Sequence, residues 1–259
     1  MSENIHIRVS LAVLLIDDFT GRIITSSGAR ATVPDCGKPV IKKEGFHVFT
    51  NLTDPVIRIS AKGPCYCEEE RLVDIRKLDP ANPVVRVRMT PNRWYALPSS
   101  AVRTEVKLPA DTELFVFSQE SSNYKRLLSD YRKGSDEISL YQGDMEELEE
   151  KACCIAGKDG IPEPLRLGTL KQREQGIYRL EMCPSGGYKK MGTRVYPASY
   201  LPAGDTKTCF LPLKSYGKKE ITYTFLSIHA GTQTVTRTVL QTDRENRIDL
   251  EGEMAYGAV

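Results

Sequence analysis

Three histidines are the side chains of this chain best suited to catalysis, and they stand far apart at His6, His47 and His229. None has the spacing of a metal or catalytic motif, and neither Gly-x-Ser-x-Gly nor His-Glu-x-x-His is present. Histidines can still converge in space, as catalytic triads do. The pattern favours structural roles, with His6 on the polar side of a strand and His47 between core aromatics. No catalytic residue is predicted.

The cysteines offer a second route to chemistry, through metal ions or disulfides. Seven are present, without a Cys-x-x-Cys pair. Cys65 and Cys67 form a Cys-x-Cys, and Cys153 and Cys154 are adjacent, whereas a structural zinc site normally needs two close pairs. An odd count together with no evident signal peptide favours reduced thiols in a cytoplasmic protein. We therefore predict no metal and no cofactor.

Paired carboxylates and glycine-bearing loops complete the list of candidates. Asp17 and Asp18 precede Thr20-Gly21, but calcium needs six or more oxygens and only this pair is evident. We expect these carboxylates to bind backbone amides of the turn. Lys189-Lys190 follows a Gly-Gly pair between expected strands, whereas a phosphate-binding loop needs a strand and then a helix. A solubilising turn is the simpler interpretation.

Composition excludes several classes of partner. Among 259 residues, 36 Lys and Arg nearly balance 34 Asp and Glu, so the basic excess of a nucleic-acid-binding protein is missing. No stretch approaches the ~20 apolar residues that cross a bilayer. The N-terminus lacks the basic region of a signal peptide, which favours a cytoplasmic location or release, as part of a particle, by a route that reads no signal peptide. The longest charge run, residues 144–150, is acidic and is expected to be solvated.

Short alternating segments dominate the first hundred residues. Apolar residues alternate from Ile5 to Leu15, again around Ile57 and Ile59, and again from Val85 to Met89. Eight short segments at ~8–12-residue spacing are typical of an all-β sandwich. The pattern predicts a core that contains the following residues: Val13, Leu15, Phe46, Val48, Ile57, Ile59, Val85 and Val87.

The order of these segments resembles a known family. Asp17-Asp18-Phe19-Thr20-Gly21 follows an apolar strand, residues 84–89 close the unit, and Pro91-Asn92-x-x-Tyr95 comes next. Over residues 9–95 this is similar to the carboxypeptidase-regulatory-like or transthyretin-like families. The resemblance implies seven-strand sandwiches that mostly carry, bind or space, and the zinc residues of the active carboxypeptidases lie in a separate domain that this chain lacks.

The second half repeats the pattern more weakly. We predict tandem Ig-like or transthyretin-like sandwiches, with domains at 1–102 and 103–259. At most one or two short helices are expected, with residues 124–131 the best candidate. Residues 219–226 and 233–240 form a hairpin over Ala230-Gly231. The row of threonines on its second strand is expected to face solvent.

Five side chains are candidates for an interface: Arg58, Arg86, Arg88, Trp94 and Tyr95. Each arginine alternates with buried residues on its strand, and arginine is enriched at interfaces. Trp94, the single tryptophan, is interpreted as a plug between domains, with an exposed recognition aromatic as the alternative.

These observations favour a non-enzymatic structural or adaptor protein that acts through protein partners, since sheet edges pair readily with a partner strand. By analogy of fold, a phage-tail-like or contractile injection particle is one possible setting. The alternatives are a carbohydrate-binding or adhesive module and, less favoured, a hydrolase whose residues converge only in the fold.

Overall fold

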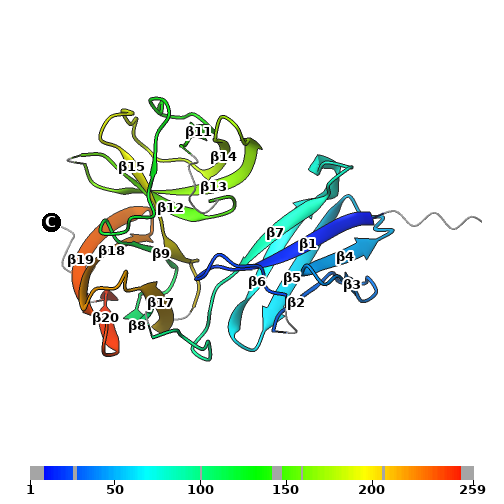
Figure 1. The fold of residues 1–259 in the computed structure, drawn as a ribbon, viewed down its shortest axis with the longest axis horizontal. Helices are drawn as coiled ribbons and strands as arrows, with labels where there is room; N and C mark the ends of the chain where they lie inside the picture. Colours follow the sequence, from blue (N-terminus) through cyan, green and yellow to red (C-terminus); the bar gives the residue numbers. More distant parts are fainter. Residues whose placement is uncertain are drawn as a thin grey trace, which may run out of the picture. The chain divides into compact units, whose positions relative to one another are not determined.

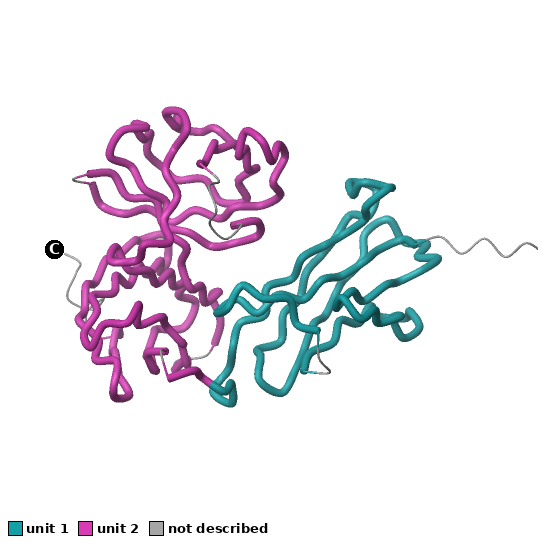
Figure 2. Tube along the Cα trace, in the orientation of Figure 1, with its two compact units in different colours: residues 1–96 teal, residues 97–259 magenta. Residues whose placement is uncertain are grey.

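The computed structural model describes residues 9–25, 28–99, 101–141, 148–158, 160–205 and 208–251. The chain divides into two compact units, residues 1–96 and 97–259 (Figure 2). Expectations for His6, residues 5–8 and most of the acidic run at 144–150 fall outside the described residues.

The first unit is a sandwich of two sheets (Figure 1). One sheet has the order β3-β4-β1-β7 and the other the order β2-β5-β6. The strands are β1 (Val9–Asp17), β2 (Arg30–Thr32), β3 (Val40–Ile41), β4 (Phe46–Thr50), β5 (Val56–Gly63), β6 (Tyr66–Asp74) and β7 (Val84–Met89), with a 3-10 turn at Ile75–Lys77 between the last two.

Alternation along the strands builds the core of this sandwich. Leu11, Val13 and Leu15 of β1 face Ile57 and Ile59 of β5 in one buried cluster. The first strand, β1, pairs with the last, β7, in parallel, from Ala12 opposite Val84 to Asp17 opposite Met89. The predicted sandwich of the first unit is therefore confirmed.

One strand has the opposite orientation from the one predicted. Leu14 of β1 pairs with Phe46 of β4, and Val13 pairs with His47. His47 and Phe49 are buried, at 2% and 3% exposure, whereas Phe46 and Val48 are half-buried on the outer face. A one-residue error in register moves every side chain to the other face. The placement of Phe46 and Val48 in the core is wrong because a polar histidine occupies the inner position.

The second unit contains another sandwich, again of a four-stranded and a three-stranded sheet. The sheets have the orders β16-β9-β18-β19 and β17-β8-β20 and enclose one apolar cluster. Their strands are β8 (Ala101–Lys107), β9 (Thr112–Phe117), β16 (Ser199–Leu201), β17 (Thr208–Lys214), β18 (Glu220–His229), β19 (Thr232–Gln241) and β20 (Asn246–Asp249). The first and last strands, β8 and β20, also pair in parallel. The tandem all-β sandwich fold is thus confirmed.

Six strands are inserted between β9 and β16, and the sequence did not distinguish them from the sandwich. They are β10 (Lys125–Arg126), β11 (Glu137–Ser139), β12 (Ala152–Ala156), β13 (Glu163–Gln172), β14 (Ile177–Met182) and β15 (Arg194–Pro197), in the order β10-β15-β12-β13-β14-β11. A bridge from Leu127 to Leu140 joins the two outer strands, and Leu128 N–H donates to the Ser139 carbonyl at 2.9 Å. The inserted sheet therefore closes on itself as a small barrel around its own apolar cluster.

A further cluster joins the barrel to the sandwich within this unit. Phe115 and Phe117 of β9 pack with Cys154 of β12 and Tyr196 of β15. The segment 124–131, where a short helix was considered, instead holds β10 and the Leu127 bridge. Within the described ranges, no helix is long and apolar enough to cross a membrane.

Candidate functional site

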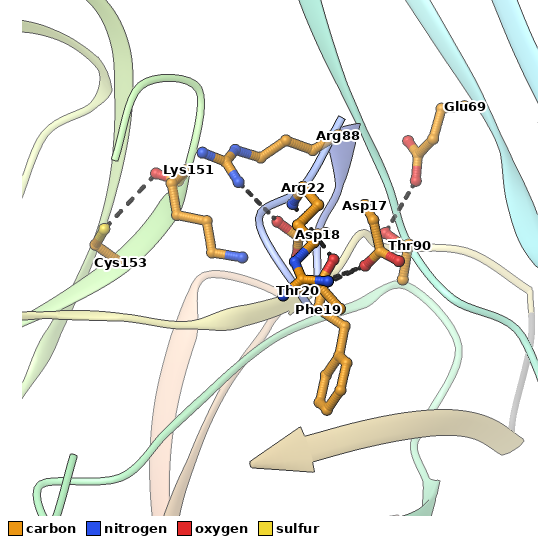
Figure 3. Close-up of polar contacts among 10 residues, drawn as sticks. All are labelled: Asp17, Asp18, Phe19, Thr20, Arg22, Glu69, Arg88, Thr90, Lys151 and Cys153. Atoms are coloured by element: carbon orange, nitrogen blue, oxygen red, sulfur yellow. Dashed lines mark hydrogen bonds and ion pairs between the residues drawn. The ribbon is translucent and has the colours of Figure 1, made fainter. Parts of the chain in front are cut away.

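A buried carboxylate organises one end of the first sandwich. Asp17, 6% exposed, ends β1, and its Oδ1 accepts hydrogen bonds from the backbone N–H groups of Phe19 and Thr20, both at 2.9 Å (Figure 3). Its Oδ2 accepts from the Tyr66 hydroxyl at 3.0 Å and the Tyr95 hydroxyl at 2.5 Å. Both carboxylate oxygens are thus engaged by protein donors, and the expectation that Asp17 satisfies turn amides is confirmed.

The Pro91-Asn92-x-x-Tyr95 segment is held against this carboxylate by the side chain of Asn92. Asn92 Nδ2 donates to the carbonyls of Pro64 and Tyr66, both at 3.0 Å, and Asn92 Oδ1 accepts from Trp94 N–H at 2.9 Å. The tyrosine rings of residues 66 and 95 meet edge to face, with centroids 5.7 Å apart. These contacts deliver the Tyr95 hydroxyl to Asp17.

The electrostatics of this corner fit a structural role. Burial and the bonds to Asp17 raise the pKa of both Tyr66 and Tyr95 well above the usual range, so both hydroxyls stay protonated and keep donating. Because these hydrogen bonds to Asp17 persist at neutral pH, they stabilise the fold. Sequence reasoning flagged Tyr95 as an interface residue, but its hydroxyl is occupied inside its own unit.

The three predicted interface arginines do not share one surface. Arg58 lies on β5 of the three-stranded sheet, and its side chain is 59% exposed and 3.8 Å from Glu70. Arg86 and Arg88 lie on β7 of the opposite sheet. Arg88 is only 12% exposed and pairs with Asp18 at 3.5 Å (Figure 3). The arginines that the alternation placed on one face therefore lie on two opposite sheets, and both Arg58 and Arg88 contact a carboxylate of their own unit.

Trp94 differs from its neighbour Tyr95. Its indole is 72% exposed, and the Arg93 guanidinium lies 5.5 Å from the ring centroid. Its backbone is fixed by Asn92, so a large aromatic is presented from a rigid corner. That Trp94 contributes to contacts between the domains stays a prediction.

The cysteines, the Lys189-Lys190 turn and potential metal ligands are the remaining candidates for chemistry. All seven cysteines are free thiols, and burial raises the pKa of Cys154 well above its usual value. Asp130 holds the Lys189-Lys190 turn, through Lys189 Nζ at 3.1 Å and Lys190 N–H at 2.7 Å. Among the described residues, no group of His, Cys, Asp and Glu side chains could hold a metal ion.

A polar pocket of about 650 Å³ lies at the loop end of the first sandwich. The β2–β3 loop contributes Asp35 and Cys36, and the β4–β5 loop contributes Asn51 and Asp54. Asp35 and Asn51 adopt left-handed backbone conformations, with φ of 58° and 56°. Apolar residues, among them Val33, Leu52 and Val56, line the pocket beside these polar ones, and the sequence pattern did not predict it.

The strand edges of the second sandwich are the other feature with evident binding capacity. β19 ends its sheet and is ten residues long, with ten consecutive pairs to β18 and no irregularity. It contains one charged residue, Arg237, and no proline. Long, regular, weakly charged edges are templates for another strand.

Most other edges in the described part of the chain are short or blocked. β2, β3 and β16 have two or three residues, and β20 has four. β17 contains Pro212. β7 alternates Arg86 and Arg88 with its core residues. The outer strands of the barrel are joined to each other, so among the described strands β6 is the only edge of comparable length to β19.

Hairpin geometry identifies which backbone groups of β19 point outward. Ala230 and Gly231 have positive φ values of 48° and 78°, as a two-residue type I′ turn requires. The flanking pair His229–Thr232 is then hydrogen-bonded, and hydrogen-bonded pairs alternate from there. Odd-numbered residues from Gln233 to Val239 therefore direct their N–H and C=O groups away from β18. The Gln241 N–H, which bonds Asn246 Oδ1 at 2.9 Å, follows the same alternation.

The threonine row on β19 does not face solvent as expected. Thr234, Thr236 and Thr238 pair with Ser227, Phe225 and Tyr223, and the two aromatic residues are in the core. These threonines are half-buried and share the inner face. On the other face, Val235 packs against the apolar cluster that joins the barrel to the sandwich, and Val239 is 55% exposed.

Comparisons with known proteins identify no family for this chain. No family model matches it, and no curated protein matches it. Two crystal structures of variants of the shaft pilin spaA from Lactobacillus rhamnosus GG align with it at 8% and 10% identity. They cover 94% and 92% of this chain and 97% and 95% of the pilin, with TM-scores of 0.23 and 0.20. At such scores the alignments carry no argument about function.

Proposed function

We propose that this chain is a structural protein that works through contacts with other proteins, and that the edge of β19 is its principal contact. The observation that carries the proposal is the ten-residue, regular, nearly uncharged edge of this strand. An added strand would receive main-chain hydrogen bonds from four outward-facing residues, and side chains on either face would provide selectivity. By the resemblance of the first sandwich, we extend the proposal to a phage-tail-like or related particle.

The experiment uses a substitution that changes the edge and leaves the sheet intact. Arg237 is exposed and its N–H points away from β18, so Arg237→Pro removes an outward donor without removing a bond to β18. Arg237→Thr is the matched control, because it removes the same charge and keeps the N–H. The protein is recovered from its natural cell and sized in native extracts.

We expect the wild-type chain and Arg237→Thr in a large complex, and Arg237→Pro at least tenfold depleted from it with an unchanged circular dichroism spectrum. If Arg237→Pro enters the complex as well as the control does, the edge of β19 is not the contact. If the wild-type chain is a monomer in its own cell, the structural role is wrong.

A second candidate function is carbohydrate binding in the polar pocket of the first sandwich. The carboxylates of Asp35 and Asp54 and the Asn51 amide line it, and such groups bind sugar hydroxyls. A glycan array with the wild-type chain and an Asp35→Ala, Asp54→Ala variant tests this candidate. Binding that the variant loses would support it, and no binding by the wild-type chain would oppose it.

A further inference from the structure

The first strand of the chain begins beyond its neighbours in the sheet. β1 pairs with β4 up to Val9 opposite Thr50, and with β7 only from Ala12 opposite Val84. The structure describes β1 from Val9 onward. The sequence upstream keeps the strand pattern, because Ile5 and Ile7 alternate with His6 and Arg8.

This segment, residues 4–9, has the composition of a strand that pairs with another. Asn4-Ile5-His6-Ile7-Arg8-Val9 contains three β-branched apolar residues at period two and neither proline nor glycine. Backbone groups of a strand need partners, and one apolar face needs cover. The other undescribed terminus, residues 252–259, contains two glycines and lacks this alternation of β-branched residues.

The edge of β19 offers what the segment needs. Its outward N–H and C=O groups extend over the seven residues from Gln233 to Val239, and an extended segment of six residues covers most of that length. On one face, the 55%-exposed Val239 provides an apolar contact for an isoleucine side chain, whereas Val235 is half-buried against the cluster that joins the barrel to the sandwich. On the other face, the half-buried threonines provide hydroxyls opposite polar side chains.

We propose that residues 4–9 of one copy of this chain add as a strand to the β19 edge of a second copy. This inference rests on the proposed function and names the partner at the same edge. The contact joins two different surfaces, so each copy keeps one free segment and one free edge, and a heterologous contact of this kind produces open chains of copies.

The test mixes two variants that are each defective at one end. Variant one carries Ile5→Asp with Ile7→Asp and retains its edge, and variant two carries Arg237→Pro and retains its segment. Controls are His6→Asp with Arg8→Asp, and Arg237→Thr. Light scattering after size exclusion gives the mass of each sample over a hundredfold range of concentration.

The wild-type chain is expected to form concentration-dependent oligomers, whereas each defective variant stays at the 29.0 kDa of one chain. Their equimolar mixture should form dimers at twice that mass and nothing larger, because one complementary pair of ends remains. A monomeric wild-type chain, or a mixture that stays monomeric, would overturn the inference. If Arg237→Pro blocks oligomers while the Ile5, Ile7 variant forms them, another segment occupies the edge, and the proposed function stands without this inference.

Discussion

The two longest edge strands in the described part of the molecule, β6 in the first unit and β19 in the second, differ in their charge and in how far other segments cover them. β6 is nine residues long and carries Glu68, Glu69, Glu70 and Arg71 in sequence, and its beginning is covered by residues 90–92 through Cys67 N–H and the Tyr66–Pro91 bridge. β19 has a single charge, and among the described strands it pairs only with β18. Since proteins normally protect long edges with charge or cover, this difference supports the proposed contact at β19.

The largest expected effect is a loss of stability of the whole first sandwich, which contains β6. Asp17→Ala leaves two tyrosine hydroxyls and two backbone amides without their acceptor, which should destabilise the first sandwich by ~3 kcal/mol or more. Asp17→Asn, which keeps an acceptor for the amides, should cost less. Hydrogen exchange with mass spectrometry should report faster exchange in residues 9–96 and unchanged exchange in β18 and β19. Equal acceleration in both units would contradict their independence.

Carboxylates added to β19 should make its edge resemble that of β6. Arg237→Glu with Val239→Glu places two carboxylates on the outer face of the edge, where both native side chains are exposed. We expect at least tenfold weaker association, about 1.4 kcal/mol, from desolvation and repulsion of the added strand. Sedimentation equilibrium measures the loss. A variant that associates as tightly as the wild-type chain would show that charge does not protect this edge.

The stability of the first sandwich should depend on pH through its buried histidine, His47. Burial lowers the pKa of His47 below 6.5, so the folded first unit resists the proton that the unfolded chain accepts. The stability due to neutral His47 is complete above pH 6.5 and is lost as the pH falls below it. Denaturant titrations of the wild-type chain between pH 7.5 and 5 should show this decline, and His47→Leu should flatten it. A decline of equal size in the variant would refute the role of His47.

The smallest effect is the exposure of the β6 edge. Glu68→Thr with Glu70→Thr removes two exposed carboxylates and their contacts with Ser60 and Arg58. Weak new self-association is expected, visible by sedimentation velocity only at high protein concentration, because residues 90–92 still cover part of the strand. Glu44→Thr, away from this strand, is the control and should behave as the wild-type chain does.

Sequence periodicity predicted the strands well, because alternation reports directly on a half-buried sheet. It predicted the β18–β19 hairpin from Ala230-Gly231 and the closing strand β7 from Val85, Val87 and Met89. It failed at β4, because a buried histidine reverses the apparent polarity of the inner face. It also could not show that strands β10 to β15 form a separate barrel, since bridges such as Leu127 to Leu140 join positions that no local pattern connects.

The candidate interface was harder to predict than the fold. Alternation showed that Arg58, Arg86 and Arg88 face outward from their strands, but the assignment of β5 and β7 to opposite sheets depends on topology. Arg88 contacts Asp18, so Arg88→Glu would create repulsion inside the unit and would be a poor probe of docking. The importance of β19 emerges only from its position at the end of a sheet.

Residue-resolved hydrogen exchange of β19 tests the central claim most directly. The amides of Val235, Arg237 and Val239 point outward, whereas those of Thr234, Thr236 and Thr238 point to β18 and provide internal controls. When the protein passes from dilute monomer to assembly, we predict that the outward amides become at least tenfold more protected and that the inward amides change little. Outward amides that exchange equally fast in the assembled protein would contradict the account.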